Sequence, residues 1–399
     1  MTSSQDLTES PRDPGPAGQL AEDAGPLSGF TIGVTAARRA EELATLLQRR
    51  GAEVIHGAAV RIVPLSDDER LVETSRDLAR RPADLVVATT GIGFRGWVEA
   101  CESWGLAAPL VAGMSQSRIL ARGPKAKGAV RAAGLREEWS PPSESSAEVL
   151  EYLLERGVAG LRIAVQLHGE PLPDFCSALR MAGAEVVEVP VYRWTTPLDV
   201  APLDRLIGAV VAGEVDALTF TSAPAAAGTL DRARRLGCGR ELEEALRGRV
   251  LAMCVGPVTA GPLRDRDIPT VWPQRGRIGA QVNRLGEELA SRCPVLPVAG
   301  HQLQVRGHAA LLDAQLCPIS PAPMRLLREL AQIPGRVRSR EELLGVLDSG
   351  GDPHAVETAV ARLRQALGDS RIVQTVVKRG YRLALDPGEC AEAEAGEEP

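Results

Sequence analysis

The chain has 399 residues, of which 44% are apolar and 25% charged, so it has enough material for two or three globular domains. Its opening residues hold no apolar stretch long enough for a signal peptide or a membrane span, so we expect a cytoplasmic protein without membrane contact. The seven cysteines and five histidines are scattered, without CxxC or HExxH spacing. This disfavours a disulfide framework or a metal site, and we expect neither metal nor cofactor.

Charge is distributed unevenly along the chain. The formal net charge is −6, yet residues 301–385 hold twelve Lys and Arg against eight Asp and Glu. A basic segment on an acidic chain is typical of a module that binds a polyanion. The two ends have solvated compositions: residues 1–28 are rich in Ser, Pro, Gly and Asp and predict a disordered leader, and residues 386–399 predict an acidic tail.

Residues 29–290 contain an internal duplication. "GAEV" occurs at 51 and again at 183, "DLVVATT" at 84 matches "DALTFTS" at 216, and "GPKAK" at 123 matches "GPVTA" at 256. In both copies short apolar strands alternate with amphipathic helices, which predicts an α/β fold with parallel sheets covered on both faces. Ligands of such sheets bind outside the carboxyl ends of the strands, so two lobes facing each other predict a cleft.

Hydroxyl side chains stand where these predicted strands end and helices begin, at Thr89–Thr90, Thr221–Ser222 and Thr259. Such residues serve as N-caps of the following helix. Together with free backbone N–H groups at a helix start, they also bind ligand carboxylates. Both roles remain open, because one helix start can fulfil both.

The order of four motifs carries a family resemblance. "GVTAARRAEELATLLQRRGAEV", "VYRW", "TFTSAPAA" and "VGPVTAGPL" follow one another within residues 30–290, which resemble uroporphyrinogen-III synthase. The resemblance implies two α/β lobes, with lobe one built from about 29–62 and 195–290 and lobe two from about 63–194. It implies that the two "GAEV" strands are the crossings between lobes, and that the cleft closes linear hydroxymethylbilane into a macrocycle without metal or organic cofactor.

Tyr192 matches the tyrosine that faces the cleft in this family. The resemblance implies that it donates a proton, or positions water, as the substrate loses its terminal hydroxyl. The alternative is that tyrosine simply suits a strand, and the first copy has Val60 at this position. The resemblance also implies a set of ligand-binding residues: Arg38, Thr90, Ser222, Gly256 and Thr259.

The sequence departs from the family pattern at three positions. Ala36 and His168 stand where an arginine is frequent, and Ala126 stands where a threonine is frequent. These departures favour a cleft that binds a ligand over one that turns it over.

The segment after residue 300 predicts three helices and a hairpin. Ser320 is a candidate N-cap for the first helix, and Ser339 with Glu342 forms a capping box for the second. A third helix is expected at about 354–367, with Val356, Val360, Leu363 and Leu367 on one apolar stripe. The stretch "RIVQTVVKRGYRLAL" then predicts a hairpin with a basic tip.

This segment resembles the winged helix-turn-helix effector domain of OmpR/PhoB-type response regulators through "PGRVRSREELL", "VARLRQALGD" and "GYRLA". The resemblance implies a DNA-binding domain at 301–385 after a linker at 291–300, a recognition helix in the major groove and a wing at 376–382. Ala361 and Val377 stand where such domains often have basic residues, and a merely solvated basic face is the alternative. The candidate contacts to double-stranded DNA are Thr358, Arg362, Arg364, Gln365, Lys378, Arg379 and Tyr381.

Three functions follow from this combination. The favoured hypothesis is a transcriptional regulator whose synthase-like lobes bind a tetrapyrrole-type or other anionic ligand. The second is an active uroporphyrinogen-III synthase that also binds DNA. The third is a ligand-free platform for homodimerisation or for docking other transcription factors. Fusions of this kind resemble regulators of nitrite and nitrate assimilation, which suggests a link to sirohaem, a product of uroporphyrinogen III.

Overall fold

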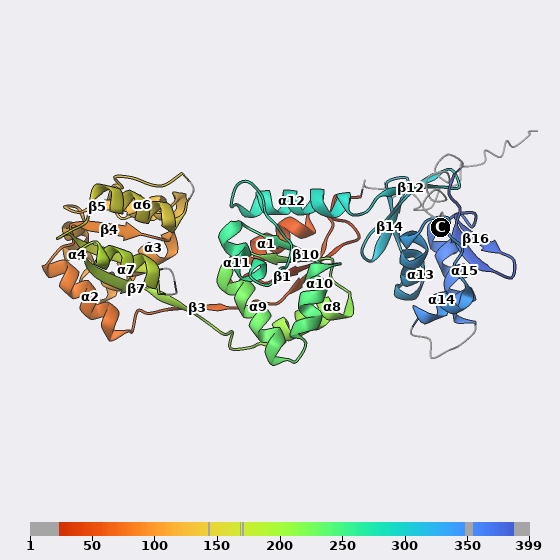
Figure 1. The fold of residues 1–399 in the computed structure, drawn as a ribbon, viewed down its shortest axis with the longest axis horizontal. Coiled ribbons are helices and arrows are strands. Elements are labelled where there is room, and N and C mark those ends of the chain that lie inside the picture. Colours follow the sequence, from red (N-terminus) through yellow and green to blue (C-terminus); the bar gives the residue numbers. More distant parts are fainter. Residues whose placement is uncertain (1–23, 143, 168, 170, 348–353, 387–399) are drawn as a thin grey trace, which may run out of the picture.

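The protein consists of three bodies in a row, with lobe one in the middle (Figure 1). The structure is a computed structural model, and it describes residues 24–142, 144–167, 169, 171–347 and 354–386. Lobe two lies on one side of lobe one and the C-terminal domain on the other. His168 and the segments 1–23 and 387–399 lie outside the described residues.

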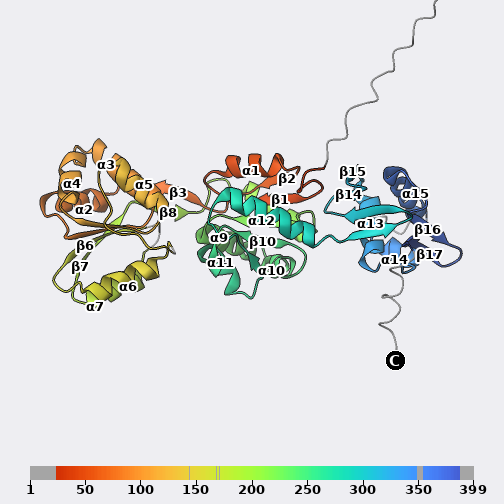
Figure 2. The same ribbon diagram turned by 90° about the horizontal axis from the view of Figure 1, so that it is seen from above.

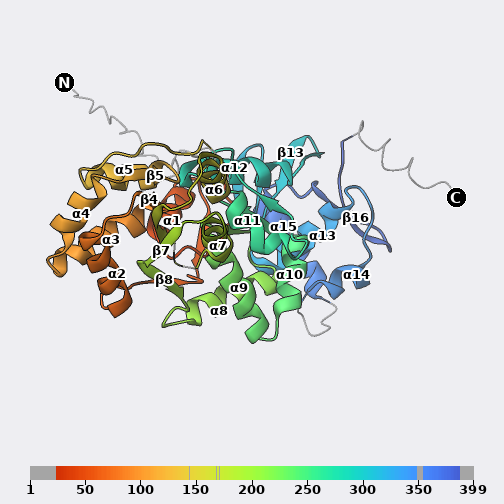
Figure 3. The same ribbon diagram turned by 60° about the vertical axis from the view of Figure 1, so that its left-hand side comes forward.

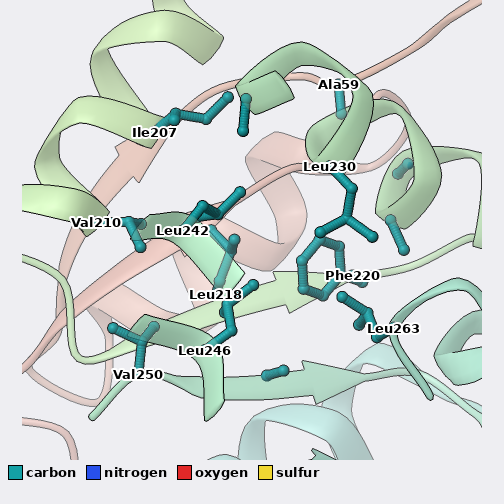
Figure 4. Packing of buried hydrophobic residues seen from close by; sticks show 14 of the residues in the cluster. Ala59, Ile207, Val210, Leu218, Phe220, Leu230, Leu242, Leu246, Val250 and Leu263 are labelled. Atoms are coloured by element: carbon teal, nitrogen blue, oxygen red, sulfur yellow. The ribbon is translucent and has the colours of Figure 1, made fainter. Parts of the chain in front are cut away.

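Lobe one is a parallel five-stranded sheet in the order β11-β10-β9-β1-β2. Helices α8–α11 cover one face of this sheet, and α1 and α12 cover the other. In the first of these layers Phe220 of β9 lies between Leu230 of α9 and Leu263 of α11 (Figure 4). The elements are β1 (Thr31–Val34), α1 (Ala40–Gln48), β2 (Glu53–His56), α8 (Ala201–Ala212), β9 (Ala217–Phe220), α9 (Ala223–Arg235), α10 (Gly239–Arg247), β10 (Leu251–Cys254), α11 (Pro257–Arg264), β11 (Thr270–Val271) and α12 (Ile278–Ser291).

Lobe two repeats this plan with a parallel sheet in the order β5-β4-β6-β7. Helices α2–α5 lie on one face and α6 and α7 on the other, as the view with lobe two in front shows (Figure 3). The elements are α2 (Glu69–Arg80), β4 (Leu85–Ala88), α3 (Gly91–Ser103), α4 (Ala107–Met114), β5 (Arg118–Ala121), α5 (Pro124–Ala132), α6 (Ser146–Arg156), β6 (Arg162–Leu167), α7 (Pro173–Met181) and β7 (Glu185–Pro190).

A two-stranded antiparallel ribbon joins the two lobes (Figure 2). It consists of β3 (Arg61–Pro64) and β8 (Tyr192–Thr195), and Pro64 pairs with Tyr192. The "GAEV" strands themselves are β2 and β7, which are edge strands inside their own sheets. The prediction that the "GAEV" strands cross between the lobes is therefore wrong by one strand. The crossing is made by β3, which follows β2, and by β8, which follows β7.

The duplication is visible in the order of elements, since β1-α1-β2-β3 of the first copy corresponds to β6-α7-β7-β8 of the second. Each copy then continues through a helix, a strand and two further helices into its own next strand. The predicted α/β fold with two parallel-sheet lobes is confirmed, because strands of both copies pair in the same relative order.

The C-terminal domain is the predicted winged helix-turn-helix. Four antiparallel strands, β12 (Val295–Val298), β13 (His301–Val305), β14 (Ala309–Leu312) and β15 (Gln315–Pro318), precede three helices and a hairpin. The segment 291–300 was expected to be a linker, but it contains β12. The backbone of β12 pairs with β13, so this part of the segment belongs to the C-terminal domain. The remaining elements are α13 (Pro321–Gln332), α14 (Arg340–Gly345), α15 (Ala355–Leu367), β16 (Val373–Val376) and β17 (Gly380–Leu383).

Two local predictions about helix starts had different outcomes. Ser339 and Glu342 form the expected capping box of α14. The Ser320 side chain, however, makes no capping hydrogen bond to α13. Pro323 occupies the position whose backbone N–H a capping serine commonly binds, and proline has no N–H to donate.

The expected leader extends less far into the chain than residue 28. Leu27 is fully buried among the side chains of α1 and α12, and its amide donates to the Arg50 carbonyl (2.9 Å). An apolar residue buried at this position fixes residues 24–28 on lobe one. At the other end, Asp386 accepts a hydrogen bond from the Gly300 amide (3.0 Å), so the first residue of the expected acidic tail is held by the C-terminal domain.

Candidate ligand cleft and nucleic-acid interface

The predicted ligand-binding residues of lobe one lie at the carboxyl edge of its sheet. Arg38 follows β1, Ser222 follows β9 and Gly256 follows β10. Ser222 is the N-cap of α9, and its hydroxyl accepts from the Ala225 amide (3.3 Å). Thr259, in the first turn of α11, is buried. The structure therefore places these residues along one edge, where Ser222 fulfils the capping role.

Tyr192 lies at the matching edge of lobe two. It is the first residue of β8 and is only 6% exposed. Its hydroxyl is 3.5 Å from Oγ1 of Thr90, the N-cap of α3, and Thr90 Oγ1 also accepts from the Gly93 amide (3.2 Å). The Tyr192 ring packs edge-on against Trp194, with centroids 5.8 Å apart. The phenol is therefore held at a helix start, where a polar ligand group can be bound.

Gln166, which the sequence did not single out, organises this corner. Its fully buried side chain lies near the end of β6, and Oε1 accepts from the amides of Thr89 (3.2 Å) and Thr90 (3.0 Å). The Thr89 hydroxyl donates in return to the Gln166 carbonyl (2.6 Å). A single glutamine in an apolar strand gives no recognisable sequence signal, and its role depends on a contact 76 residues away in the chain.

One arginine from each lobe interacts electrostatically with Tyr192. Burial lowers the pKa of Arg122, which follows β5, and its guanidinium donates to Ser146 Oγ (3.3 Å). Partial desolvation also lowers the pKa of Arg38, and the positive charge of Arg95 on α3 lowers it further. Arg38 keeps solvent contact and lies within electrostatic range of Tyr192, as does Arg122. Cations with lowered pKa values gain most from an incoming carboxylate.

A hollow of about 400 Å³ has walls from both lobes, and one of its lining residues is Arg39, the chain neighbour of Arg38. Arg39 pairs with Glu42 there, whereas Lys125 and Arg277 form no ion pair with any residue that the structure describes. The start of α12 forms one wall, and Arg277 makes no side-chain capping bond to it. Unpaired cations beside a helix start favour an anion. The hollow is lined by Arg39, Glu42, Lys125, Gly276, Arg277, Ile278, Gly279 and Ala280.

The departures from the family pattern leave apolar surfaces in place of polar ones. Ala36 and Ala126 are both buried, at 2% exposure, and bring no polar group to the cleft. His168 lies outside the described residues. Val60, the counterpart of Tyr192, packs in the core of lobe one as Tyr192 packs in that of lobe two, but only the tyrosine brings a hydroxyl to this position.

The recognition helix α15 presents a polar face to solvent. Thr358, Arg362 and Gln365 are exposed along this face, while Val356, Val360 and Leu363 are buried on the other. The intervals of four and three residues place the polar side chains on one side of the helix. At the tip of the wing, Lys378 and Arg379 are exposed next to Val377, which is 79% exposed.

Two of the predicted DNA contacts are held inside the domain instead. The Arg364 guanidinium donates to the Val373 carbonyl (2.6 Å) and to Thr375 Oγ1 (2.9 Å), so it ties α15 to the wing strand β16. Tyr381 is only 4% exposed, and the Arg340 guanidinium lies 5.3 Å from its ring centre. We reassign both as residues that position the wing. The Arg364 guanidinium is bound to β16, and the Tyr381 ring is buried against Arg340.

The described residues show neither a metal site nor a membrane span. Within these ranges, no three His, Cys, Asp or Glu side chains are grouped so that they could hold a metal ion. The six cysteines in the same ranges are free thiols. No helix in the part of the chain that the structure covers is both long enough and apolar enough to cross a bilayer.

This combination of lobes and winged helix defines the class of protein. Residues 41–283, more than half of the chain, match the family described as uroporphyrinogen-III synthase HemD, so the chain belongs to this family. Residues 315–383 match the C-terminal domain of transcriptional regulatory proteins. The chain thus joins a HemD-type domain to an OmpR/PhoB-type DNA-binding domain, a combination that supports a DNA-binding regulator.

Particular relatives resemble one part or the other. YjjA from Bacillus subtilis, an uncharacterised protein, is 29% identical over 263 residues, which cover 65% of this chain and 96% of YjjA. The crystal structure of a uroporphyrinogen-III synthase mutant from Thermus thermophilus covers 66% of this chain and 99% of its own, at 29% identity and a TM-score of 0.55. The regulatory protein CseB of Streptomyces avermitilis is 38% identical over 92 residues, 22% of this chain and 39% of CseB.

Proposed function

We propose that this protein is a transcriptional regulator whose cleft binds an anionic ligand of tetrapyrrole type and thereby controls DNA binding. The observation that carries the DNA-binding part is the polar face of α15, where Thr358, Arg362 and Gln365 are exposed among the residues that the structure describes. Arginine and glutamine side chains on a major-groove helix read guanine and adenine edges. Lys378 and Arg379 on the wing add backbone contacts that fix position.

The cleft chemistry supports an anionic ligand. Arg38 and Arg122 both interact electrostatically with Tyr192, and Lys125 and Arg277 line a hollow with walls from both lobes. A linear or cyclic tetrapyrrole of the uroporphyrinogen type carries many carboxylates on a flat or flexible apolar frame. Cations that are spread over two lobes can each bind a different carboxylate of such a ligand. A single small anion would need no more than the N–H groups of one helix start.

Ligand binding is tested by titrating the full chain with uroporphyrin III, a stable oxidised relative of the macrocycle, and following porphyrin fluorescence. Arg122→Gln is expected to weaken binding by about 10–150-fold, because a hydrogen bond to a charged group contributes about 1.5–3 kcal/mol. Arg240→Gln is the matched control, since Arg240 is an exposed arginine on α10 that pairs with Glu244 on the same helix. Equal affinity in wild type and Arg122→Gln would contradict the proposed site.

DNA binding is tested with duplexes selected from genomic fragments by the purified protein. Arg362→Ala is expected to weaken binding to the selected sequence by about 5–150-fold, the equivalent of about 1–3 kcal/mol for one bidentate arginine–guanine contact. Arg240→Ala again serves as the control. Unchanged affinity of Arg362→Ala at physiological salt would remove α15 as the recognition helix.

A second function, active uroporphyrinogen-III synthase, is favoured by one observation, the position of Tyr192. Its hydroxyl lies 3.5 Å from Thr90 at the start of a helix, where a phenol can donate a proton to a departing hydroxyl. The test is turnover of hydroxymethylbilane by wild type and Tyr192→Phe, with separation of isomers I and III. If wild type forms isomer III and Tyr192→Phe does not, the protein is an enzyme. If both proteins yield isomer I, the protein is a regulator without synthase activity.

The genes that it controls are proposed from the resemblance alone. Regulators of this architecture resemble those of nitrite and nitrate assimilation, and nitrite reductase needs sirohaem, which derives from uroporphyrinogen III. A tetrapyrrole-responsive regulator of nitrogen assimilation would connect cofactor supply to enzyme synthesis. A cytoplasmic location is part of this proposal, and the match to the DNA-binding domain of transcriptional regulatory proteins supports it.

A further inference from the structure

The turn between β13 and β14 of the C-terminal domain rests on lobe one. Arg306 at this turn is only 8% exposed, and its guanidinium donates to the carbonyls of Gly25 (3.2 Å) and Ser28 (2.9 Å). The same guanidinium lies 5.4 Å from the ring centre of Phe30. A buried arginine that donates to two backbone carbonyls of another domain makes a specific contact, because its guanidinium would otherwise lose these two acceptors.

His308 extends the contact to the first strand of lobe one. Its amide donates to the Gly29 carbonyl (2.8 Å), and Nδ1 lies 3.3 Å from Thr31 Oγ1. On its other side, Nε2 is 3.4 Å from Glu53 Oε1 at the start of β2. Gly29 has φ +86°, and a Cβ there would lie 3.2 Å from the Ala309 Cβ. The two backbones approach so closely that a side chain at Gly29 would crowd the turn.

Gly307, at the centre of the turn, packs directly on the carboxylate of Asp216. A Cβ added to Gly307 would lie 2.1 Å from Asp216 Oδ2, which is far inside contact distance. Asp216 Oδ2 also accepts from the Thr31 amide (2.8 Å), and burial raises the pKa of this carboxyl, opposed by that amide and by the charges of Arg328 and His308. Arg328 on α13 donates to the Gly307 carbonyl from the other side.

The strands that touch this turn also lead to the cleft. Thr31 opens β1, which ends shortly before Arg38, and Asp216 immediately precedes β9, which ends shortly before Ser222. Four residues of strand span only about 13 Å. The C-terminal domain therefore lies at the amino ends of β1 and β9, and the carboxyl ends of both strands lead to cleft residues.

The docked arrangement leaves the DNA-binding face open. β14 and α13 lie between lobe one and the recognition helix α15 (Figures 1 and 2). Arg362 is exposed while the domain is docked on lobe one, as far as the described residues extend. The contact of Val305–Ala309 with lobe one therefore leaves the DNA-binding face of α15 accessible. We call this contact the mount.

We propose that the turn formed by Val305–Ala309 mounts the DNA-binding domain on lobe one, so that the two form one cooperative unit in which DNA binding and the state of strands β1 and β9 are linked. The regulatory meaning of this link rests on the proposed function. The mount itself does not need a ligand, so its test is made without one.

The test is hydrogen exchange of the full chain, read by mass spectrometry over Gly25–Thr31 and Val305–Ala309, with and without a mixed-sequence duplex at low salt. Gly307→Ala is the disrupting variant, because Gly307 has an ordinary φ and an added methyl meets the Asp216 carboxylate. Gly208→Ala is the matched control, since this exposed glycine on α8 has no atom within 4 Å of an added Cβ. Arg306→Gln, which removes the bonds to Gly25 and Ser28, is the second variant if Gly307→Ala fails to fold.

Gly307→Ala and Arg306→Gln are expected to raise exchange at least about 10-fold in both segments, because local opening then no longer has to break the contact. DNA should slow exchange of Gly25–Thr31 in wild type and Gly208→Ala, but not in the disrupting variants. Exchange in Gly25–Thr31 that is the same in all four proteins, or indifferent to DNA in wild type, would overturn the proposal. Since no porphyrin is present, a failure of ligand binding leaves this result unaffected.

Discussion

The two lobes follow the same chain path twice, and the clearest difference between them lies at their amino edges. Asp84 in lobe two accepts from the Arg162 amide (2.7 Å), and Asp216 in lobe one accepts from the Thr31 amide (2.8 Å). Each carboxylate thereby ties the start of one central strand to the residue before its neighbour. Only Asp216 also faces another domain, through Gly307. A local motif required by the fold has gained a second role where a further domain is present.

The carboxyl edges differ as well. Gln166 near the end of β6 joins Thr89 and Thr90 through several hydrogen bonds. Thr35 occupies the matching place after β1 and donates one hydroxyl bond to the Thr219 carbonyl (2.7 Å). Lobe two therefore supplies a fixed polar corner with Tyr192, while lobe one supplies shorter side chains at helix starts. The two lobes share the same arrangement of strands and helices, but they carry different polar side chains at the carboxyl edges of their sheets.

The largest effects are expected from core truncations that separate the lobes. Trp97→Ala in lobe two and Phe220→Ala in lobe one should each cost about 3–5 kcal/mol of unfolding free energy, because both side chains are fully buried. Trp97→Ala additionally leaves the Ser75 hydroxyl without its indole donor. Urea unfolding followed by region-resolved hydrogen exchange measures both.

The regional pattern sharpens the comparison. Trp97→Ala should loosen lobe two while leaving the contact between Gly25–Thr31 and the winged domain protected. Phe220→Ala should loosen lobe one and that contact together. Equal loosening of all three bodies by either variant would show that the chain unfolds as a single unit and would contradict the separation of roles.

An intermediate effect is expected at the carboxyl edges. Gln166→Leu should cost about 2–3 kcal/mol, because it leaves the buried amides of Thr89 and Thr90 without their acceptor. Thr35→Val removes one hydroxyl bond and should cost about 1 kcal/mol. Denaturant midpoints of the two variants give the ratio. A larger cost for Thr35→Val would mean that lobe two does not hold the more ordered corner.

The smallest effect is a pH dependence in the C-terminal domain. Hydrogen bonding to Asp313 (2.7 Å) raises the pKa of His301 above its usual 6.5, with help from Asp369 (3.3 Å). The folded state therefore favours the charged imidazole, so the stabilisation is complete below about pH 6.5 and is lost as pH rises through the raised value. The melting temperature of this domain should fall over that range in wild type and stay flat in His301→Gln.

Much of the fold could be predicted from the sequence because its signals are local or repeated. Apolar runs and capping residues predicted the strands and helices. The repeated motifs "GAEV", "DLVV/DALT" and "GPKA/GPVT" indicated two similar sheets. The exact crossing was missed by one strand, since edge strand and ribbon strand have similar apolar patterns. Leu27 was missed because a single buried leucine in a Pro- and Gly-rich segment has no periodicity.

The site was less predictable, because its parts meet across the fold. Thr90, Arg38 and Tyr192 stood in recognisable motifs, but Arg122 and Gln166 did not. On α15, periodicity placed Arg364 near the polar face, whereas its guanidinium reaches back to β16. Sequence patterns describe one element at a time, and long side chains such as arginine choose partners on another.

The central claim, that occupancy of the cleft controls DNA binding, is tested most directly by the dissociation constant for the selected duplex with and without saturating uroporphyrin III. Wild type is expected to change its affinity at least about 5-fold, the lower range of coupling between two sites. Arg122→Gln should respond only at higher porphyrin concentrations, and Gly307→Ala should bind porphyrin without changing its affinity for DNA. An unchanged dissociation constant in wild type with porphyrin bound would contradict the account.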